Sequence, residues 1–414
     1  MTEVLESADF LLSSAAGRHA GYARLRGLNP VVPITLRSGE TGFLVTGFEA
    51  ARLALTDQRL QGRTATVGNR RNMPGHLHKG MNSHMLNMGP PDHTRLRRLV
   101  SAAFTRRRML AMRPRIQAIT DGLLDTMGQA DEADFIGGLA LPLPIRVLIQ
   151  MFGIPEEDAG QFHSWTEIIT SSTLTRDELG EAGAEMLAYI QGLLTRKRRE
   201  PQPDLLSALV AVHDGADRLS GDELTSMVFL LLTAGHETTV NLIGNTMLSL
   251  LTHPSQLAAV RAEPGLLPAS IEEGLRFESP VQVALRFSLE PLELAGVHIP
   301  PGATVLVALL AANRDLRRFP GPDLLDVTRT DNPQLAFGYG VHHCIGAPLA
   351  RLEGVVAIGS TLSRFPGLRL AGDAASLGWR PSVIMHGLTT LPVRLRPGPA
   401  SLAGPVSPAA KARP

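Results

Sequence analysis

The sequence predicts a mainly α-helical protein with small β-sheets. Apolar residues recur at helical spacing over most of the chain, which places them on one face of each helix. Two short stretches, at residues 31–47 and 292–310, instead alternate around turn residues, as strands do. One apolar run, from Ser220 to Leu251, is much longer than the others and predicts a helix that crosses the whole domain.

The N-terminal part begins with a predicted hairpin and continues with helices. The apolar runs 31–36 and 42–47 are separated by turn-forming residues. Residues 62–91 have no clear period, and a stretch of that length in a compact domain is usually functional, so we expect it to cover a binding site. Helical spacing is clear at Leu96, Leu99, Val100 and Ala103, and again at Ile116, Ile119, Leu123, Leu124 and Met127.

The long central helix is interrupted by small and polar residues. Ser220 and Glu223 form a capping box at its start. Residues 234–239, Ala-Gly-His-Glu-Thr-Thr, stand where a buried helix normally has large apolar side chains. Glycine loosens a helix and a threonine hydroxyl can bond to a preceding carbonyl, so we expect a local bend here. A satisfied polar kink without chemistry is the alternative, whereas the zinc-protease pattern H-E-x-x-H is excluded because residue 240 is valine.

The composition excludes several classes of partner. The chain has 40 basic and 39 acidic residues, so its net charge of +1 gives no global field that would attract nucleic acid or an anionic membrane. Residues 1–22 carry acidic groups and only a short apolar stretch, which predicts neither a signal peptide nor a membrane anchor. We therefore expect a cytoplasmic protein with one domain over residues 1–398 and a disordered tail rich in proline, alanine and glycine at residues 399–414.

Cys344 is the only cysteine, which excludes an internal disulfide and any metal cage of several thiolates. A lone cysteine is most often a small buried apolar residue, so its neighbours decide its role. Glycines at 338, 340 and 346 let the backbone approach a flat ligand closely. Cys344 precedes a predicted helix that runs to about Phe365, and a helix N-terminus favours a thiolate, the form of sulfur that binds iron.

The segment around Cys344 closely resembles the cytochrome P-450 signature F-x-x-G-x-H/R-x-C-x-G. Two further motifs of that family precede it in the expected order. Residues 234–238 resemble the oxygen-binding motif A/G-G-x-D/E-T, and residues 273–276 resemble the pair E-x-x-R. The resemblance extends over about residues 30–396, and its signature is matched by Phe337, Gly340, His342, Cys344 and Gly346.

This resemblance implies the cytochrome P-450 fold, a triangular prism with haem between the long central helix and the helix after the cysteine loop. It implies Cys344 as the axial ligand of a non-covalently bound haem b. Glu237 and Thr238 would be the acid and alcohol that deliver protons to dioxygen. The other implied haem contacts, which include partners of the propionates, are His93, Arg97, Ala234, Gly235, Arg286, Phe337, Gly338, His342 and Gly346.

Glu273 and Arg276 would form the structural ion pair behind the haem. The sequence departs from the family near this pair, because Leu324 stands where many members have an arginine that completes the network. Arg329 is our candidate for the missing partner. His236 is a second departure, a polar residue inside the oxygen-binding turn.

The implied activity is monooxygenation, that is, hydroxylation or epoxidation of a large apolar small molecule with O2. The sequence resembles actinobacterial enzymes that tailor polyketides such as macrolides, with a steroid-like or xenobiotic substrate, a peroxide-using haem enzyme and a haem carrier as alternatives. The implied substrate contacts are Met85, Leu86, Met88, Ala234, Val283, Ala284, Ile384 and Met385. Electrons from NAD(P)H would come through a ferredoxin reductase and a ferredoxin, docked on Arg98, Arg106, Arg107, Arg108, Arg113 and Arg351.

Overall fold

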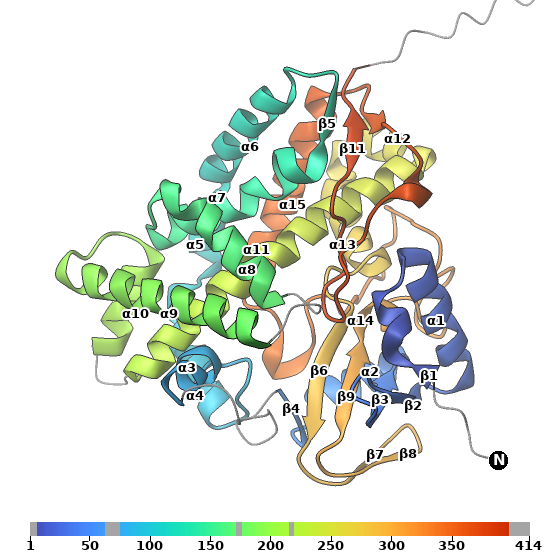
Figure 1. Ribbon diagram of the computed structural model, residues 1–414. Coiled ribbons are helices and arrows are strands. Elements are labelled where there is room, and N and C mark those ends of the chain that lie inside the picture. The colour runs from blue at the N-terminus through green and yellow to red at the C-terminus, as the bar shows by residue number, and fades with distance from the viewer. Residues whose placement is uncertain (1–5, 63–74, 171–175, 215–218, 397–414) are drawn as a thin grey trace, which may run out of the picture.

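The computed structural model describes residues 6–62, 75–170, 176–214 and 219–396. Helices gather on one side of the molecule, and the largest sheet lies with the N-terminal helix on the other (Figure 1). The expected mainly helical architecture with small sheets is thus confirmed. The helices are α1 Ala15–Leu28, α2 Phe48–Thr56, α3 Gly75–Asn82, α4 Asp92–Ala103, α5 Arg106–Ala111, α6 Arg113–Met127, α7 Pro142–Phe152, α8 Ala159–Thr170, α9 Arg176–Arg199, α10 Leu205–Asp214, α11 Gly221–Thr252, α12 Pro254–Ala262, α13 Leu267–Phe277, α14 Leu309–Ala312 and α15 Ala347–Arg364.

The strands of the described residues form one sheet of six strands and two smaller ones. The six-stranded sheet has the order β1-β2-β3-β9-β6-β4, the second sheet the order β10-β11-β5, and β7 pairs with β8. β2 and β3 form the predicted hairpin, in which Val31 pairs with Val45. The strands are β1 Glu6–Ser7, β2 Val31–Thr35, β3 Thr41–Val45, β4 Leu60–Gln61, β5 Glu132–Asp134, β6 Val283–Ser288, β7 Leu292–Leu294, β8 Val297–Ile299, β9 Thr304–Ala308, β10 Arg369–Leu370 and β11 Pro392–Arg394.

Alternation along β9 divides the six-stranded sheet into two packed faces. Val305 and Val307 belong to an apolar cluster that includes residues of α2, whereas Leu306 and Ala308 belong to one that includes Tyr22 of α1. Both faces are covered because successive side chains of a strand point to opposite sides. The sheet therefore forms a firm platform beside the helical part of the molecule.

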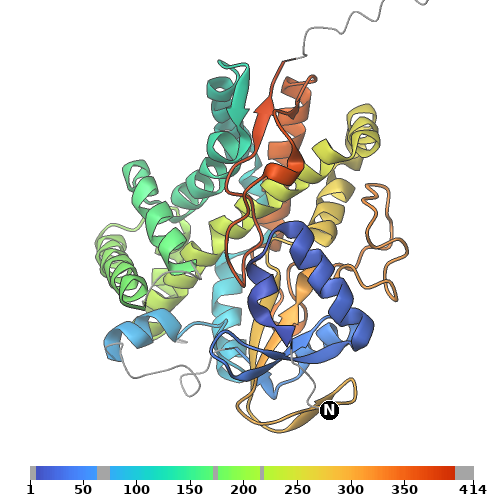
Figure 2. The same ribbon diagram turned by 45° about the vertical axis from the view of Figure 1, so that its right-hand side comes forward.

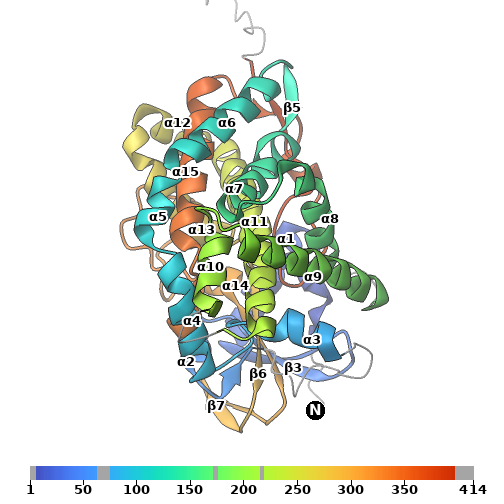
Figure 3. The same cartoon turned by 90° about the vertical axis from the view of Figure 1, so that its left-hand side faces the viewer.

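The helix α11 is the long helix predicted from the sequence. Ser220 and Glu223 form its capping box, and its 32 residues correspond to about 48 Å. α9 and α10 lie in front of it in Figure 3, and α15 packs against it. Figure 2 shows how it crosses the molecule. Among the described residues, no helix has the length and apolar character that a membrane span requires.

The region expected to be a loop contains a helix. α3 occupies Gly75–Asn82 and packs against α9 and α11, and Gly80 allows close contact with Leu187 of α9. Sequence periodicity missed this helix because it is short and its composition is polar and glycine-containing. Residues 63–74 of that region and the expected tail at 399–414 lie outside the described residues.

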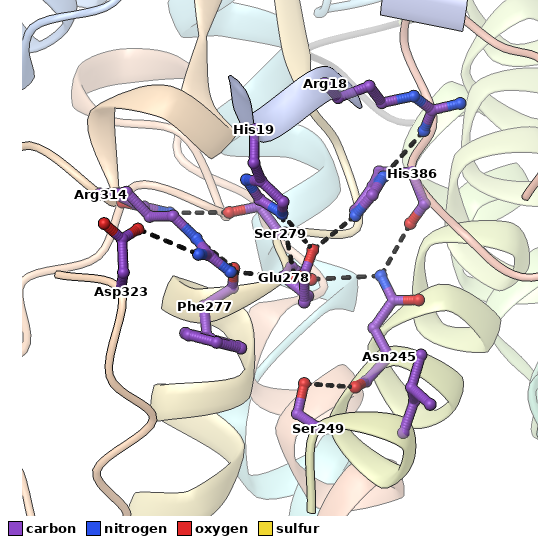
Figure 4. A network of polar contacts seen from close by, with 12 residues as sticks. Arg18, His19, Asn245, Ser249, Phe277, Glu278, Ser279, Arg314, Asp323 and His386 are labelled. Atoms are coloured by element: carbon purple, nitrogen blue, oxygen red, sulfur yellow. Dashed lines mark hydrogen bonds and ion pairs between the residues drawn. The ribbon is translucent and has the colours of Figure 1, made fainter. Parts of the chain in front are cut away.

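A polar network joins the N-terminal helix to the C-terminal loop, residues 379–388 (Figure 4). Glu278 accepts hydrogen bonds from His19, His386 and Arg314, at 3.0, 2.6 and 2.9 Å. Although burial raises the pKa of Glu278, the charges of His19 and Arg314 hold it well below its ordinary value. His386 Nδ1 accepts a hydrogen bond from Arg18 at 2.8 Å. Arg18 contacts His386 and Arg314 contacts Glu278, so the network fixes the C-terminal loop. The positive charges of these two arginines disfavour the binding of a metal cation at Glu278 and His386.

Candidate functional site

A cavity lies between the middle of α11 and the start of α15. It encloses about 860 Å³ of space free of protein atoms, part of it open to solvent, and its lining is mostly apolar. Cys344 lies in one wall, and Ala234 and Gly235 of α11 lie in another. The structure thus brings together many of the residues that sequence analysis assigned to haem or substrate. Those that line the cavity are Met85, Leu86, Arg97, Ala234, Gly235, His342, Cys344 and Gly346.

The loop that carries Cys344 is held in shape by its own backbone. The amide of Cys344 donates a hydrogen bond to the carbonyl of Phe337 at 2.9 Å, so the loop folds back on itself. Gly338 and Gly340 both have φ of +72°, in the left-handed region where side chains are strained. A Cβ at Gly340 would also meet Thr56 at 2.8 Å. These glycines therefore fix the turn that brings the sulfur to the N-terminus of α15.

The pKa of Cys344 is raised, and this differs from the expectation that the helix N-terminus alone favours a thiolate. Desolvation by the surrounding cavity wall is the dominant cause, although Cys344 is exposed to the cavity, while hydrogen bonds from the amides of Gly346 and Ala347 and the charges of Arg97 and Arg351 act in the opposite direction. The protein supplies hydrogen-bond donors to the sulfur, and a bound metal cation would supply the remaining positive charge needed for a thiolate.

Four basic side chains gather at one side of the cavity. The rings of His93 and His342 lie with centroids 4.4 Å apart, and Arg97 Nη2 donates to the carbonyl of His343 at 2.6 Å. Burial, followed by the charges of Arg286, His93 and Arg97, lowers the pKa of His342 to about 4. Burial also lowers the pKa of Arg286. The charges of the two arginines therefore disfavour protonation of the two histidines.

This cluster fits an anionic ligand. Both ring nitrogens of His93 and the Nε of Arg286 are buried and have no hydrogen-bond partner among the described residues. His93 is 2% exposed and Arg286 6%. Buried donors without partners are costly, and a carboxylate would satisfy them. An apolar cavity with a sulfur in its lining and basic side chains beside it matches haem, with its iron and its two propionates.

The expected acid and alcohol lie on α11 but not in the lining of the cavity. Glu237 is 4% exposed, and its Oε1 lies 3.2 Å from Arg380 Nη1 in the C-terminal loop. Thr238 is partly buried, and its hydroxyl donates to the carbonyl of Ala234 at 2.9 Å. Thr239, which sequence analysis did not select, lines the cavity. The hydroxyl of Thr238 thus bonds to a preceding carbonyl as expected, within a continuous helix.

Glu273 and Arg276 form a fully buried ion pair, with Arg276 Nη2 2.7 Å from Glu273 Oε1. Arg329 Nε lies 3.2 Å from Glu273 Oε2, so the arginine selected from the sequence completes the cluster. Arg276 also donates to the carbonyl of Leu324 at 2.9 Å, while the side chain of Leu324 is exposed. The absence of an arginine at position 324 is therefore compensated by an arginine five residues later.

The residues assigned to the substrate lie in different surroundings. Met85 and Leu86 line the cavity, and Met88 packs on the main core without lining it. Val283 is 1% exposed and packs in the core between the sheet and α1, so its side chain does not face the cavity as expected. The reason is the strand register, which turns Val283 to the sheet face opposite Ala284.

Ile384 and Met385 lie at the tip of the C-terminal loop, outside the cavity lining. Ile384 is 43% exposed, and Met385 forms an isolated bridge with Val281. Sequence analysis also missed much of the apolar lining, because single apolar residues on helices do not show which of them face a ligand. The missed lining residues are Phe104, Leu148, Met151, Leu230, Leu231, Thr239, His343, Ile345, Leu349, Ala350 and Glu353.

Comparison with known proteins agrees with this geometry. The family model described as Cytochrome P450 matches residues 148–367. Cytochrome P450 107B1 of Saccharopolyspora erythraea is 47% identical over 92% of this chain and 95% of its own length. The chain belongs to the cytochrome P450 family. It is therefore an oxidoreductase of the monooxygenase type with a haem cofactor, as the sequence resemblance implied.

Two other members of the P450 family carry more specific names. 6-Deoxyerythronolide B hydroxylase of Saccharopolyspora erythraea is 45% identical to this P450 over 90% of this chain and 95% of its own length. The structure of the tirandamycin C-bound P450 monooxygenase TamI has a TM-score of 0.85 and 42% identity, covering 92% of this chain and 97% of that one. The P450 fold expected from the sequence is thus confirmed.

Replacing Arg286 by methionine is expected to weaken haem retention in this P450. The loss of one hydrogen-bonded charge costs about 1.5–3 kcal/mol, which corresponds to roughly ten- to hundredfold faster haem loss. Transfer of haem to an excess of a haem-scavenging globin, followed by absorbance, measures this rate. Arg59→Met, at an exposed arginine paired with Asp57, is the control. Equal haem loss in both variants would contradict the assignment of Arg286.

Proposed function

We propose that this P450 inserts one oxygen atom from O2 into a large apolar small molecule, by hydroxylation or epoxidation, in macrolide or polyketide metabolism. The observation that carries the proposal is that Cys344 lines the same apolar cavity as Ala234 and Gly235 of α11. We further propose that it holds haem b without a covalent bond and works in the cytoplasm. Two relatives, a 6-deoxyerythronolide B hydroxylase and a tirandamycin C-bound monooxygenase, support a polyketide substrate.

Each group of residues has a separate task in this proposal. Haem ligated by a thiolate activates dioxygen for attack on C–H bonds. Cys344 holds the iron, and His93, Arg97, Arg286 and His342 hold the propionates. The apolar lining excludes water from the reaction. Glu237 takes protons from solvent and passes them to the hydroxyl of Thr238. This hydroxyl directs the protons to dioxygen beside residues 234–238.

A binding and turnover screen tests the substrate class. We expect 6-deoxyerythronolide B or tirandamycin C to change the spin state of the haem, read in its absorbance spectrum. Turnover with NADPH, a ferredoxin and its reductase should then give a product with one added oxygen atom. If a steroid such as testosterone shifts the spectrum and is oxidised while both polyketides fail, the polyketide assignment is refuted. Product formed only with added hydrogen peroxide would favour a peroxide-using enzyme.

We propose that electrons arrive from an acidic ferredoxin at the basic surface near α4–α6. Arg107 and Arg113 are exposed, whereas Arg351 is paired with Glu272 and the side chain of Arg106 lies outside the described part. Arg98 and Arg108 have other interactions. The exposed positions Arg107 and Arg113 are therefore the best places to test docking.

Raising the salt concentration is expected to lower kcat/KM for the ferredoxin by on the order of tenfold or more, because salt screens exposed charges. Arg113→Glu should lower it at low salt and weaken the salt dependence. Reduction by dithionite, which needs no docking, is the control and should change little. Turnover that does not respond to salt would refute a docking site based on charge.

A further inference from the structure

Arg380 lies between a buried and an exposed carboxylate. Its Nη1 is 3.2 Å from Oε1 of Glu237 on α11 and 3.6 Å from Oε1 of Glu167 on α8. The side chains of Glu237 and Glu167 are 6% and 57% exposed, and that of Arg380 is 18% exposed. Nη1 of Arg380 thus contacts the buried Glu237, the expected proton donor, and also the exposed Glu167.

The backbone of Arg380 is fixed, so its side chain is the part that can move. Its amide donates to the carbonyl of Gly387 at 2.9 Å, and its carbonyl accepts from Arg18 Nη2 at 2.9 Å. The same Arg18 binds His386 in the network of Figure 4. The Nε of Arg380 is buried and has no hydrogen-bond partner among the described residues, so the guanidinium is held mainly through Nη1.

The two carboxylates hold Arg380 for different reasons. An ionised Glu237 is buried and needs a counter-charge, so breaking this pair while Glu237 is charged is costly. Glu167 is hydrated, and its pairing contributes little. His236, beside Glu237, adds little positive charge at neutral pH because burial lowers its pKa to about 4. His163 also faces this region from α8, since its ring lies 6.2 Å from that of His236 and its Nε2 lies 3.9 Å from Oε2 of Glu167.

We propose that Arg380 is a positioning residue for proton delivery, which pairs with Glu237 when that carboxylate is ionised and with Glu167 when it is protonated. A proton from solvent water binds the carboxylate of Glu237 and removes its attraction for Arg380. Arg380 then stays with Glu167, and neutral Glu237 turns to give its proton toward Thr238. The carboxylate that remains pairs with Arg380 again. This inference rests on the proposed role of Glu237 as the proton relay.

Glu167→Gln tests the proposal, because it removes the charge of the outer partner at an exposed position, where Glu167 contacts Arg380 and, at 3.9 Å, His163. We expect kcat for oxygen consumption to fall roughly two- to fivefold, the factor that an exposed ion pair gives. KM should not change, and the ratio of kcat in H2O to that in D2O should rise. The assay uses NADPH, a ferredoxin, its reductase and 6-deoxyerythronolide B. Because reduction of O2 to hydrogen peroxide or to water takes protons whether or not product forms, the rate of that reduction reports proton delivery even with a poor substrate.

Glu156→Gln is the matched control, since it removes a similar exposed contact, 3.5 Å from Arg146 and 69% exposed. It should leave kcat and the isotope ratio unchanged. Arg380→Lys, which keeps the charge, should retain more coupled turnover than Arg380→Gln. If Glu167→Gln behaves like Glu156→Gln in both readouts, the proposal is overturned.

Glu237→Gln separates this inference from the proposed function. If Glu237→Gln slows oxygen consumption strongly and Glu167→Gln does not, the relay stands and the role of Arg380 is wrong. If Glu237→Gln has no effect, the relay itself fails, and the inference about Arg380 fails with it. We expect both variants to slow oxygen consumption, and we expect the ratio of kcat in H2O to that in D2O to be larger in Glu167→Gln than in the unmodified protein.

Discussion

Glu273→Ala is expected to destabilise the protein by about 3–5 kcal/mol, the cost of leaving a buried partner charge unpaired. The carboxylate of Glu273 accepts hydrogen bonds from Arg276 and Arg329 and from the amide of Asp326. Its removal leaves Arg276, which is 0% exposed, with its charge uncompensated. Chemical denaturation of the haem-loaded protein, followed by the Soret band and by circular dichroism, measures the change.

Glu132→Ala is the control, because it removes the carboxylate of a glutamate–arginine ion pair at the surface. Glu132 pairs with Arg394 at 2.6 Å, and both side chains are about half exposed, so its loss should cost under about 1 kcal/mol. A loss of stability in Glu273→Ala no larger than that in Glu132→Ala would show that the buried cluster does not hold the core behind the haem.

Thr238→Ala is expected to separate oxygen consumption from product formation. In the proposed relay, this hydroxyl directs protons from Glu237 to dioxygen, so without it reduced oxygen should leave as hydrogen peroxide. The product formed per O2 consumed should fall by on the order of 10²-fold, the lower end of what a positioned proton donor contributes. Parallel measurement of NADPH, O2, peroxide and product gives this ratio.

Two neighbouring variants distinguish the hydroxyl from its surroundings. Thr238→Ser keeps the hydroxyl and should keep most of the coupling. Thr239→Ala removes the other hydroxyl, whose Oγ1 donates to the carbonyl of Gly235 at 3.3 Å. If Thr239→Ala loses coupling and Thr238→Ala does not, the alcohol of the proton relay is Thr239, the residue that lines the cavity.

Sequence patterns predicted those structural features that depend on residues close together in the sequence. The capping box at Ser220 and Glu223 acts within a few residues and forms as expected, and Gly338 and Gly340 shape the turn before Cys344 through their positive φ. The third partner of Glu273 was also found, because Arg329 is the nearest arginine after the missing position at Leu324. In each case the chemistry needed is visible as a residue type at a fixed spacing.

Contacts between distant segments were not visible in the sequence. Arg380 reaches Glu237 across 143 positions, and no pattern marks it as a partner. Val283 was assigned to the substrate because the family resemblance implied it, but the pleat of β6 turns it into the core. The raised pKa of Cys344 depends on burial, which only the folded protein shows. Tertiary packing decides such features.

The absorbance spectrum of the reduced protein with carbon monoxide tests ligation by Cys344 most directly. The purified protein should contain haem, and the Soret band of its carbon-monoxide complex should lie at the long wavelength that thiolate ligation gives. Cys344→His should shift this band to the shorter wavelength of histidine-ligated haem. A folded protein without haem, or one whose unmodified form already gives the histidine-type band, would contradict the account.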